Sequence, residues 1–431
     1  MLRRRLALLV ALGLGPLALS ICSSATAATP VPGRYIVVLK GRAPVADFAG
    51  TASRLGATVE RSFPELHAVV VSLPTDRLPA LAGDPMVAYV TPDRRVALRP
   101  LERASVAPTT PTGVMRIGAG PDNGTGTSVS PNRPERTTAV AVVDTGISNR
   151  SDLNVAGGYD CSGAGDFSDA NGHGTHVAGI IGGKGLPGVV GVSPGTPLYA
   201  VRVFDASGSG PLSNVICGLN WVSDHATANR IKAVNLSLSE PGSDDRFCGN
   251  TNQDPLHLAV CELAGSQIVV VTAAGDHGED LATSIPASYN EVVAVTAMAD
   301  FDGRPGGKAP EATCRDGGRD DTAAHFSDYA AAGRRDQDHV IAAPGVCIAS
   351  DWNDGGTKAL SGTSMAAAHV SGLVARCFDS DACSGKDGPQ VIDKLRTDAA
   401  ERPEGTGFDG DTSRPITDRY YGNLVWDRRG Y

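Results

Sequence analysis

The sequence predicts an α/β protein with a doubly wound, mostly parallel sheet, preceded by a small α+β unit. From about residue 114 onward, near-continuous apolar runs rich in β-branched residues alternate with helix-like segments. Such runs are typical of parallel strands that helices cover on both faces. The expected strands are 139–144, 197–204, 231–238, 267–274 and 291–298, and the expected helices are 176–183, 212–226 and 254–265.

The N-terminal part has another pattern, which predicts the small α+β unit. Its expected elements, in order, are strand 34–40, helix 47–57, strand 67–73, helix 75–85 and an extended segment 87–98. Pro79 interrupts the second helix, and the order is similar to a split β-α-β arrangement. Residues 99–113 are rich in Pro, Thr and Ser, which predicts a linker before the larger domain at 114–431.

The extreme N-terminus predicts a secretory signal over residues 1–28. Three arginines at 3–5 precede an apolar stretch at 6–19, and Ala25-Thr26-Ala27 offers a cleavage site. A twin-arginine export route is an alternative to ordinary secretion. Attachment of a lipid to Cys22 is another alternative, but the bulky Ile21 before it disfavours that processing. We therefore expect a secreted, extracellular protein, without a membrane anchor once the signal is removed.

Composition and cysteine content narrow the class further. The net charge is -9 and no long basic run occurs, which argues against nucleic acid as a partner. Beyond the signal an even number of cysteines remains, which in an exported chain favours disulfides. Proximity favours Cys377 with Cys383 and Cys314 with Cys347. Zinc is the rival interpretation, but the chain has no C-x-x-C motif, and His173-Gly-Thr-His176 lacks the H-E-x-x-H pattern.

Three local sequences carry the chemistry. AVAVVDTGI places Asp144 at a strand end, NGHGTHVAGIIGG places His173 just before a helix, and LSGTSMAAAHVSG places Ser364 at a helix start. Acyl transfer by a serine needs a base to take its proton and a buried acid to orient that base. The helix N-terminus also supplies the backbone N–H of Ser364 to a developing oxyanion.

Each of these residues also has an ordinary structural interpretation. Asp144 could form a turn, Ser364 could cap a helix, and His173 could be a hydrogen-bonded structural histidine. Their joint occurrence is much harder to explain in this way. A fourth motif, GVSPG at 191–195, matches the G-x-S-x-G nucleophile elbow, but there the residue after Ser193 is Pro194, which has no N–H for an oxyanion.

Taken together, these motifs make the chain similar to subtilisin-family serine endopeptidases made with a propeptide. VVDTGI, HGTHVAG and GTSMA resemble the family's catalytic motifs, and LYAVRVFDASGSG, NLSLS, AAPGV and YGNLVW resemble its scaffold segments. The resemblance implies an inhibitory propeptide at 29–98, a processing site within the linker 99–113, and a peptidase domain at 114–431. It also implies a cleft in which a substrate peptide adds as a strand between two edge segments. The implied cleft residues are Gly208, Ser209, Gly210, Ser237, Leu238, Ser239, Ala273, Ala274 and Gly275.

One position departs from the family pattern. After Ala-Ala-Gly the family has an asparagine whose amide donates to the oxyanion, and this chain has Asp276. An ionised carboxylate has no donor, and losing such a donor typically costs about 2.7–4 kcal/mol. Protonating an ordinary aspartate at pH 7 costs roughly 4 kcal/mol, so protonation gains nothing unless the site raises the pKa of Asp276. The hypothesis is that Asp276 acts when neutral, which predicts a slow enzyme with an acid-shifted pH profile.

Two milder departures and several alternatives remain at this point. Ala368 replaces the usual proline of the helix after Ser364, and Ser239 replaces a glycine and should narrow the cleft. A catalytically silent scaffold that binds peptides or a protein partner is the alternative to an active enzyme, and a processing protease with few substrates is another. The resemblance implies no cofactor for the chemistry, polypeptide substrates and a monomer. It allows a structural calcium, for which the sequence assigns no ligands.

Overall fold

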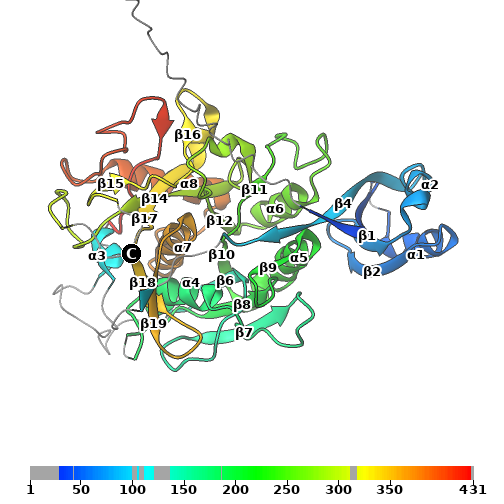
Figure 1. Cartoon of the computed structure of the whole chain (residues 1–431), viewed down its shortest axis with the longest axis horizontal. Coiled ribbons are helices and arrows are strands. Elements are labelled where there is room, and N and C mark those ends of the chain that lie inside the picture. The colour runs from blue at the N-terminus through cyan, green and yellow to red at the C-terminus, as the bar shows by residue number, and fades with distance from the viewer. Residues whose placement is uncertain are drawn as a thin grey trace, which may run out of the picture.

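The computed structural model describes residues 29–41, 43–99, 104–105, 111–120, 136–185, 187–310 and 318–428. A small N-terminal unit stands beside a larger body that contains the rest of the described chain (Figure 1). The expected signal at 1–28 lies outside the described residues, and so does much of the expected linker at 99–113.

A parallel sheet forms the centre of the body. Its strands follow the order β7-β8-β6-β10-β12-β14-β17, each parallel to its neighbours, and β15 pairs antiparallel with β14. Strand β6 has β8 on one side and β10 on the other, so the sheet winds outward from it in both directions. The strands are β6 Ala139–Asp144, β7 Val155–Asp160, β8 Leu198–Arg202, β10 Ile231–Leu236, β12 Val269–Ala273, β14 Val292–Ala299, β15 Thr322–Ala323 and β17 Val340–Pro344.

Helices cover both faces because every second side chain of a strand points to the same face. In β6, Val140 and Val142 enter one hydrophobic core, and Ala141 and Val143 enter the other. The first core includes α4, α7 and α8, and the second includes α5 and α6. The helices are α3 Thr112–Arg116, α4 His173–Gly182, α5 Leu212–Asn229, α6 Pro255–Gly265, α7 Thr363–Asp379 and α8 Gly388–Ala400.

The predicted doubly wound sheet is confirmed, including each of the five expected strands and three expected helices of the body. His173 is the first residue of α4 rather than a residue just before the helix. Sequence patterns missed β7, β17 and α8. Helix α8 gives only a weak sequence pattern because its apolar face is narrow, with Val391, Ile392 and Leu395 buried among polar residues.

The small unit is an antiparallel sheet in the order β2-β3-β1-β4, with α1 and α2 packed against it. The predicted α+β arrangement is therefore confirmed, although the pattern did not delimit β2. The expected helix 75–85 is a short 3₁₀ turn followed by α2. The elements are β1 Pro30–Leu39, α1 Val45–Arg54, β2 Thr58–Phe63, β3 Ala68–Ser72, α2 Leu78–Ala82 and β4 Val87–Ala97.

Strand β4 joins the small unit to the body (Figure 1). Its last residues pair antiparallel with β9 (Ser209–Pro211) of the body. Further back along β4, the carboxylate of Asp93 accepts hydrogen bonds from the N–H (3.0 Å) and hydroxyl (2.6 Å) of Ser213, in the first turn of α5. Asp93 is fully buried and also pairs with Arg34. The small unit thus caps a helix of the body.

Short antiparallel pairs complete the body. Strand β19 (Thr357–Leu360) pairs with β18 (Ile348–Asp351) on one side and with β5 (Ala104–Ser105) on the other. The remaining pairs are β11 (Glu240–Pro241) with β13 (Ser284–Ile285) and β16 (Ala330–Ala331) with β20 (Arg419–Tyr420).

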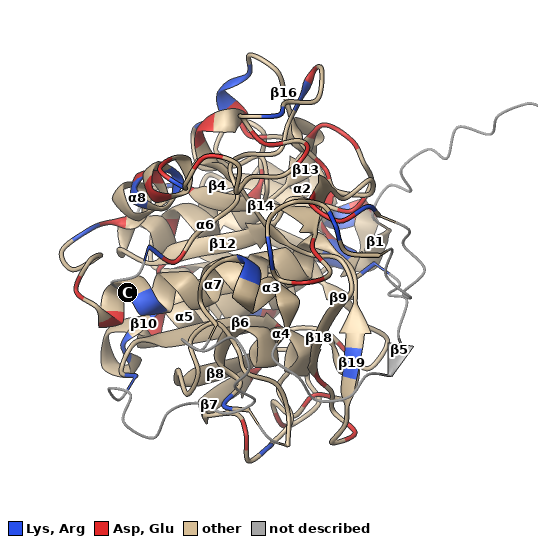
Figure 2. Cartoon of the chain, turned by 90° about the vertical axis from the view of Figure 1, so that its left-hand side faces the viewer, with Lys and Arg blue, Asp and Glu red and all other residues tan. Residues whose placement is uncertain are grey.

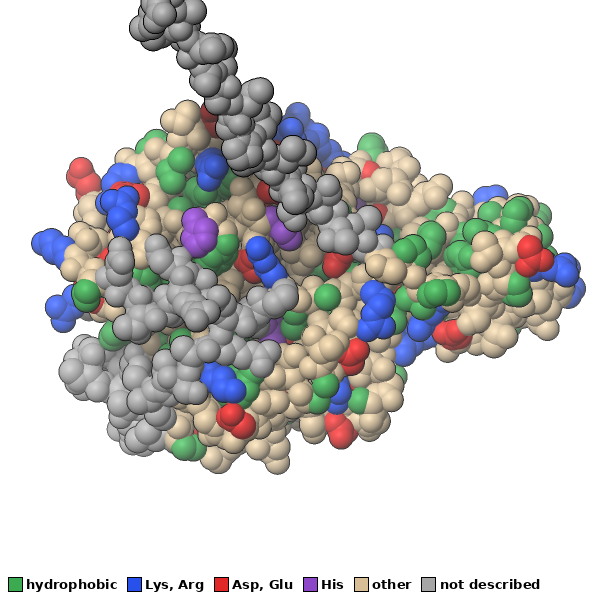
Figure 3. All heavy atoms as spheres, viewed as in Figure 1, with side chains coloured by type: hydrophobic (Ala, Val, Ile, Leu, Met, Phe, Trp, Pro, Cys, Tyr) green, Lys and Arg blue, Asp and Glu red, His purple; other side chains and the backbone are tan. Residues whose placement is uncertain are grey.

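Acidic and basic residues are interspersed along loops and helix ends of the described chain (Figure 2). The space-filling view shows the small unit projecting from one side of the body (Figure 3). Across the described ranges, none of the helices combines the length and apolar character needed to cross a membrane.

Three disulfides have both cysteines among the described residues. They join Cys161 to Cys217, Cys248 to Cys261, and Cys377 to Cys383. The predicted pair Cys377–Cys383 is confirmed. Cys347 is also disulfide-bonded, but its predicted partner Cys314 lies outside the described residues. Since these cysteines form disulfides, the zinc interpretation loses its thiolate ligands.

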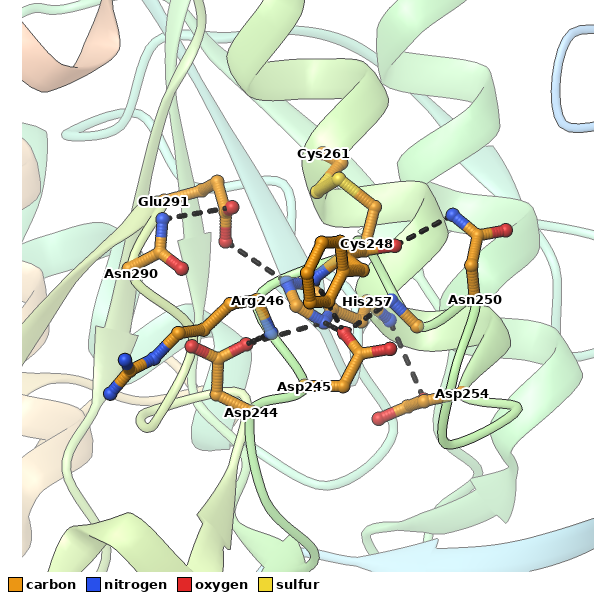
Figure 4. The surroundings of a disulfide bond; sticks show 12 residues. Asp244, Asp245, Arg246, Cys248, Asn250, Asp254, His257, Cys261, Asn290 and Glu291 are labelled. Carbon is orange, nitrogen blue, oxygen red and sulfur yellow. Dashed lines mark hydrogen bonds and ion pairs between the residues drawn. A yellow bond between two sulfur atoms is a disulfide. The ribbon is translucent and has the colours of Figure 1, made fainter.

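The Cys248–Cys261 disulfide fixes a loop to α6 beside a buried histidine. His257 lies between Glu291 on one side and Asp244 and Asp245 on the other (Figure 4), with its Nε2 3.0 Å from Glu291. Burial alone would lower the pKa of His257, but the surrounding carboxylates raise it. The same ring stacks on Tyr289, at 4.0 Å between centroids. This cluster anchors the loop to the body.

The disulfides differ in the length of chain they close, which predicts unequal contributions to stability. Cys161–Cys217 spans 56 residues and Cys377–Cys383 spans 6. Loop-closure entropy then predicts that replacing the first pair by serines lowers the free energy of unfolding by about 4 kcal/mol, and the second pair by about 2 kcal/mol. Guanidinium unfolding of full-length chains carrying Ser364→Ala, to prevent self-digestion, measures both. Equal losses, or a larger loss for the second pair, would contradict this expectation.

Candidate active site

A pocket lies beyond the carboxyl ends of the central strands, where doubly wound sheets bind ligands. Asp144 ends β6, residues 237–241 follow β10, and residues 275–277 follow β12. The helices α4 and α7 begin nearby, with His173 and Thr363 as their first residues. Residues distant in sequence therefore converge at this edge because each follows a strand or opens a helix.

Asp144 and His173 are in direct contact and almost completely buried. Nδ1 of His173 is 2.8 Å from Oδ1 and 2.9 Å from Oδ2 of Asp144, and the N–H of Thr145 donates to Oδ1. Burial alone would lower the pKa of His173, but Asp144, with smaller contributions from Asp169 and Asp276, raises it. The carboxylate therefore orients the ring and stabilises its protonated form, leaving Nε2 for another partner.

Ser364 is the second residue of α7 and lines the pocket. It is 8% exposed, whereas Thr363 before it is fully buried. Because Ser364 lies in the first turn of a helix, its backbone N–H has no partner within the helix and the helix dipole favours negative charge there.

Asp276 lies in the same pocket, tied to the residue before Ser364. Its Oδ1 accepts hydrogen bonds from the N–H and the hydroxyl of Thr363, both at 2.8 Å. An asparagine could accept the same two bonds through its carbonyl oxygen, and its amide would then take the place of Oδ2. Oδ2 lies over Gly362, 3.3 Å from where a Cβ of that glycine would stand. The two bonds from Thr363 thus fix Asp276 through Oδ1, and no hydrogen bond to Oδ2 is recorded among the described residues.

The surroundings raise the pKa of Asp276. Enclosure by protein is the main cause, and the nearby Asp328 adds to it. The two hydrogen bonds from Thr363 and the positive charge of Arg99 act in the opposite direction without cancelling the effect of burial. His277, next along the chain, is half-exposed, and its contact with Asp328 raises its pKa. The pKa of Asp276 is therefore shifted in the direction that the sequence-based hypothesis requires.

Glycines are required at two close approaches around the site. A Cβ at Gly174 would lie 2.1 Å from the carbonyl oxygen of Gly146, so α4 could not approach the turn after Asp144. Gly275 has a φ of +117°, and a Cβ there would lie 2.0 Å from Oδ2 of Asp328 and 2.9 Å from the hydroxyl of Ser239. These approaches explain why His173 and Asp276 each adjoin a glycine.

The end of β4 enters the predicted cleft. Val96 pairs with Gly210, Ala97 pairs with Ser209, and the N–H of Leu98 donates to the carbonyl of Gly208 at 2.8 Å. On the other side the recorded contact is not a strand ladder: the N–H of Ala97 donates to Oε1 of Glu240 at 3.4 Å. The small unit thus occupies the cleft as an added strand on one edge.

The other predicted cleft residues fall into two groups. Ser237, Leu238, Ser239, Ala273 and Gly275 line the pocket. Ala274 is fully buried behind it, and its N–H donates to Val295. Ser239 and Ser284 form a hydroxyl–hydroxyl bond of 2.7 Å, and that Ser239 narrows the cleft stays a prediction.

The structure adds residues that sequence patterns did not select. Thr363 fixes Asp276, and Glu240 and Arg99 lie in the pocket. Glu240 could have been suspected as the one acid in an otherwise small and apolar segment, SLSEPG. The histidines His176 and His369 are structural: burial lowers their pKa values to about 3 and about 4, and both bond to backbone carbonyls.

Neither the elbow-like serine nor the acidic clusters offer a second site. Ser193 is fully buried, and its hydroxyl accepts a bond from Thr196. Asp300, Asp302 and Asp320 lie close together, but Arg116 lies 3.4 Å from Asp300, and backbone N–H groups already bond to Asp300 and Asp320. The positive charge of Arg116 beside Asp300 opposes a further cation there, so we assign no calcium ion to this cluster.

Comparisons with known proteins agree with this arrangement. The model of the subtilase family matches residues 135–422, and that of the fervidolysin N-terminal prodomain matches residues 18–93. M-protease of Shouchella clausii is 33% identical over 315 residues, covering 73% of this chain and 69% of the relative. Subtilisin E of Bacillus subtilis is 32% identical over 330 residues, covering 75% and 73%.

A solved structure is also similar to this chain. A cold-adapted subtilisin-like serine proteinase is 27% identical, with a TM-score of 0.53, and the match covers 74% of this chain and 98% of that one. The chain therefore belongs to the subtilase family. It is a serine endopeptidase with an N-terminal prodomain, and the family needs no cofactor for its chemistry.

The raised pKa of Asp276 predicts an effect on stability with a definite sign. Between the unfolded pKa of about 3.9 and the higher folded pKa, the folded state binds more protons, so its stability falls as pH rises. Asp276→Asn, which keeps both Thr363 bonds, should therefore gain stability relative to Asp276 between pH 4.5 and pH 7.5. Guanidinium unfolding at both pH values, in chains carrying Ser364→Ala, measures this.

Asp245 provides a control of opposite sign. Five backbone and side-chain donors of the following loop, led by the N–H groups of Phe247 and Thr251, outweigh the effect of burial and lower its pKa. Asp245→Asn should therefore lose stability relative to the parent as pH rises from about 2 to about 5, because the effect is confined to the range around and below the unfolded pKa of about 3.9. An Asp276→Asn advantage that shrinks toward neutral pH would contradict the raised pKa.

Proposed function

We propose that this protein is a secreted peptidase that cuts peptide bonds with Asp144, His173 and Ser364 as its catalytic triad. The observation that supports it best is the buried Asp144–His173 pair at the sheet edge where Ser364 lies in the first turn of α7, beside a pocket that the end of the small unit also lines. In this proposal His173 takes the proton of Ser364 as the hydroxyl attacks, and then gives it to the leaving amine. Asp144 holds the ring in the required tautomer.

Asp276, in its neutral form, would complete the oxyanion hole with the backbone N–H of Ser364. The tie from Thr363 to Oδ1 supports this role, because it leaves Oδ2 as the oxygen that carries the proton. A neutral acid can donate one hydrogen bond, as the usual amide does. The role demands opposite protonation states in one site, since His173 must be neutral and Asp276 protonated.

Because activity needs a neutral His173 together with a protonated Asp276, the enzyme should be slow at neutral pH. The pKa of His173 is raised, so the ring is neutral only at higher pH, and Asp276 is protonated only below its own raised pKa. The fraction of molecules with both groups in the active form is then set by the separation of these two pKa values. The profile of kcat/KM should be bell-shaped, with its alkaline limb set by Asp276.

The segment boundaries proposed from sequence are a signal at 1–28, a propeptide at 29–98, a linker with the processing site at 99–113 and the peptidase domain at 114–431. The prodomain match and the insertion of β4 beside β9 support an intramolecular inhibitor. The expectations of a monomer, of secretion and of no membrane attachment belong to the same proposal. A silent binding scaffold is disfavoured because the relatives are named as proteases.

Self-processing tests the nucleophile. The full-length chain, refolded, should release its N-terminal unit, and Ser364→Ala should abolish the release while keeping the fold. Asp144→Asn should slow the reaction about 10⁴-fold, because His173 would adopt the wrong tautomer. Gel analysis over time measures the cleavage, and circular dichroism checks folding. Processing by a highly purified Ser364→Ala chain at the parent rate would exclude Ser364 as the nucleophile.

Asp276→Asn tests the oxyanion donor. The amide donates at every pH, so kcat at pH 7.5 should rise by about tenfold to a hundredfold, and the alkaline limb should disappear, leaving a rise through the His173 titration only. Glu279→Gln is the control, because it removes an exposed carboxylate from the same loop without touching the pocket, and should change kcat by less than twofold. An unchanged pH profile in Asp276→Asn would contradict the proposed role.

A further inference from the structure

The pocket beside Ser364 contains two carboxylates and one bound cation. Glu240 and Asp276 belong to the body, and Arg99 belongs to the chain that enters from β4. In the pairing with β9, Val96, Ala97 and Leu98 take successive positions along the cleft, so Arg99 is the residue that reaches Ser364. Arg99 thus stands where a substrate would place the residue before the bond to be cut.

Glu240 is a buried carboxylate, and the groups that stabilise its negative charge belong mainly to the small unit. It is 9% exposed, and its recorded hydrogen bond is from the N–H of Ala97 at 3.4 Å. No arginine or lysine within the described ranges is in ion-pair contact with it, and its pKa is raised because burial outweighs the effect of Arg94, also of β4, and of His277. When the small unit leaves, Ala97 and Arg94 leave with it. Glu240 then faces the emptied cleft without these partners, and a cation from a substrate could pair with it there.

We propose that this pocket is a specificity site for a basic side chain, arginine or lysine, immediately before the scissile bond, with Glu240 as the residue that selects it. This inference rests on the proposed function, since it treats the pocket as part of a peptidase cleft. The substrate class is then polypeptides with basic residues at the cut. His277, at the rim, opposes a cation only when protonated.

The charge of Arg99 also suggests how a basic segment in the pocket can inhibit the peptidase. The charge of Arg99 lowers the pKa of Asp276, so a bound arginine favours the ionised form, which cannot donate to an oxyanion. A basic residue in the pocket therefore acts against the protonated form of Asp276, so turnover would report on Asp276 as well as on Glu240. For this reason the test measures binding rather than turnover.

The test uses fluorescently labelled five-residue amides with the sequence of residues 95–99, RVALR, and the secreted protein after release of its N-terminal unit. Replacing the last arginine by citrulline keeps the shape and removes the charge, and should weaken binding about tenfold by fluorescence anisotropy. The control peptide carries citrulline at the first position. Arg95 is half-exposed and contacts Asp205 and Ser209, outside the pocket, so that change should weaken binding less than threefold.

Glu240→Gln should reduce the tenfold discrimination to less than threefold while leaving affinity for the citrulline-ended peptide within twofold of the parent, which shows that the cleft is folded. Glu279→Gln should leave the discrimination intact. Equal affinity for the arginine and citrulline ends, or full discrimination in Glu240→Gln, would overturn the inference. Selective binding without any peptide hydrolysis would overturn the proposed function alone, and hydrolysis without basic selectivity would overturn this inference alone.

Discussion

The burial of helix α7 is the constraint on which the site depends. From Thr363 to Cys377 every residue of this helix is buried, which is possible because its sequence is dominated by alanine, serine, glycine and medium-sized apolar side chains. Such a helix can pass close to β10, β12, β14 and β17 at once. Its N-terminus is therefore fixed relative to three loops, those that follow β6, β10 and β12. A serine in that first turn can be positioned without any support from mobile segments.

Asp276 shows how one atom changes the chemistry of an otherwise unchanged scaffold. An amide and a carboxyl group have the same shape, so the bonds from Thr363 to Oδ1 would serve either. The difference is confined to the second position, where nitrogen always donates and oxygen donates only when protonated. Burial favours protonation, whereas a cation in the pocket favours ionisation. In the proposed mechanism, the charge of the bound peptide and the activity of the site would be coupled through this one carboxyl group.

Much of this could be predicted from sequence because it depends on local patterns. Apolar β-branched runs identify the parallel strands, and the motifs around Asp144, His173 and Ser364 predict a shared sheet edge, since carboxyl ends of parallel strands meet there. Other features depend on contacts between distant segments. Asp93 caps α5 across two structural units, Cys161 pairs with a residue 56 positions away, and Glu240 enters the pocket only because β11 pairs with β13. Periodicity carries no information on such contacts.

The central claim is that Ser364 attacks a peptide carbonyl whose oxygen then faces a protonated Asp276. A crystal structure of the mature protein with a peptide aldehyde, solved at pH 5.5, tests it most directly. The account predicts a bond from the hydroxyl oxygen of Ser364 to the aldehyde carbon, with the resulting oxygen about 2.5–2.7 Å from Oδ2 of Asp276 and within hydrogen-bond distance of the Ser364 N–H. An adduct on another residue, or an oxygen turned away from Asp276 with water between them, would contradict it.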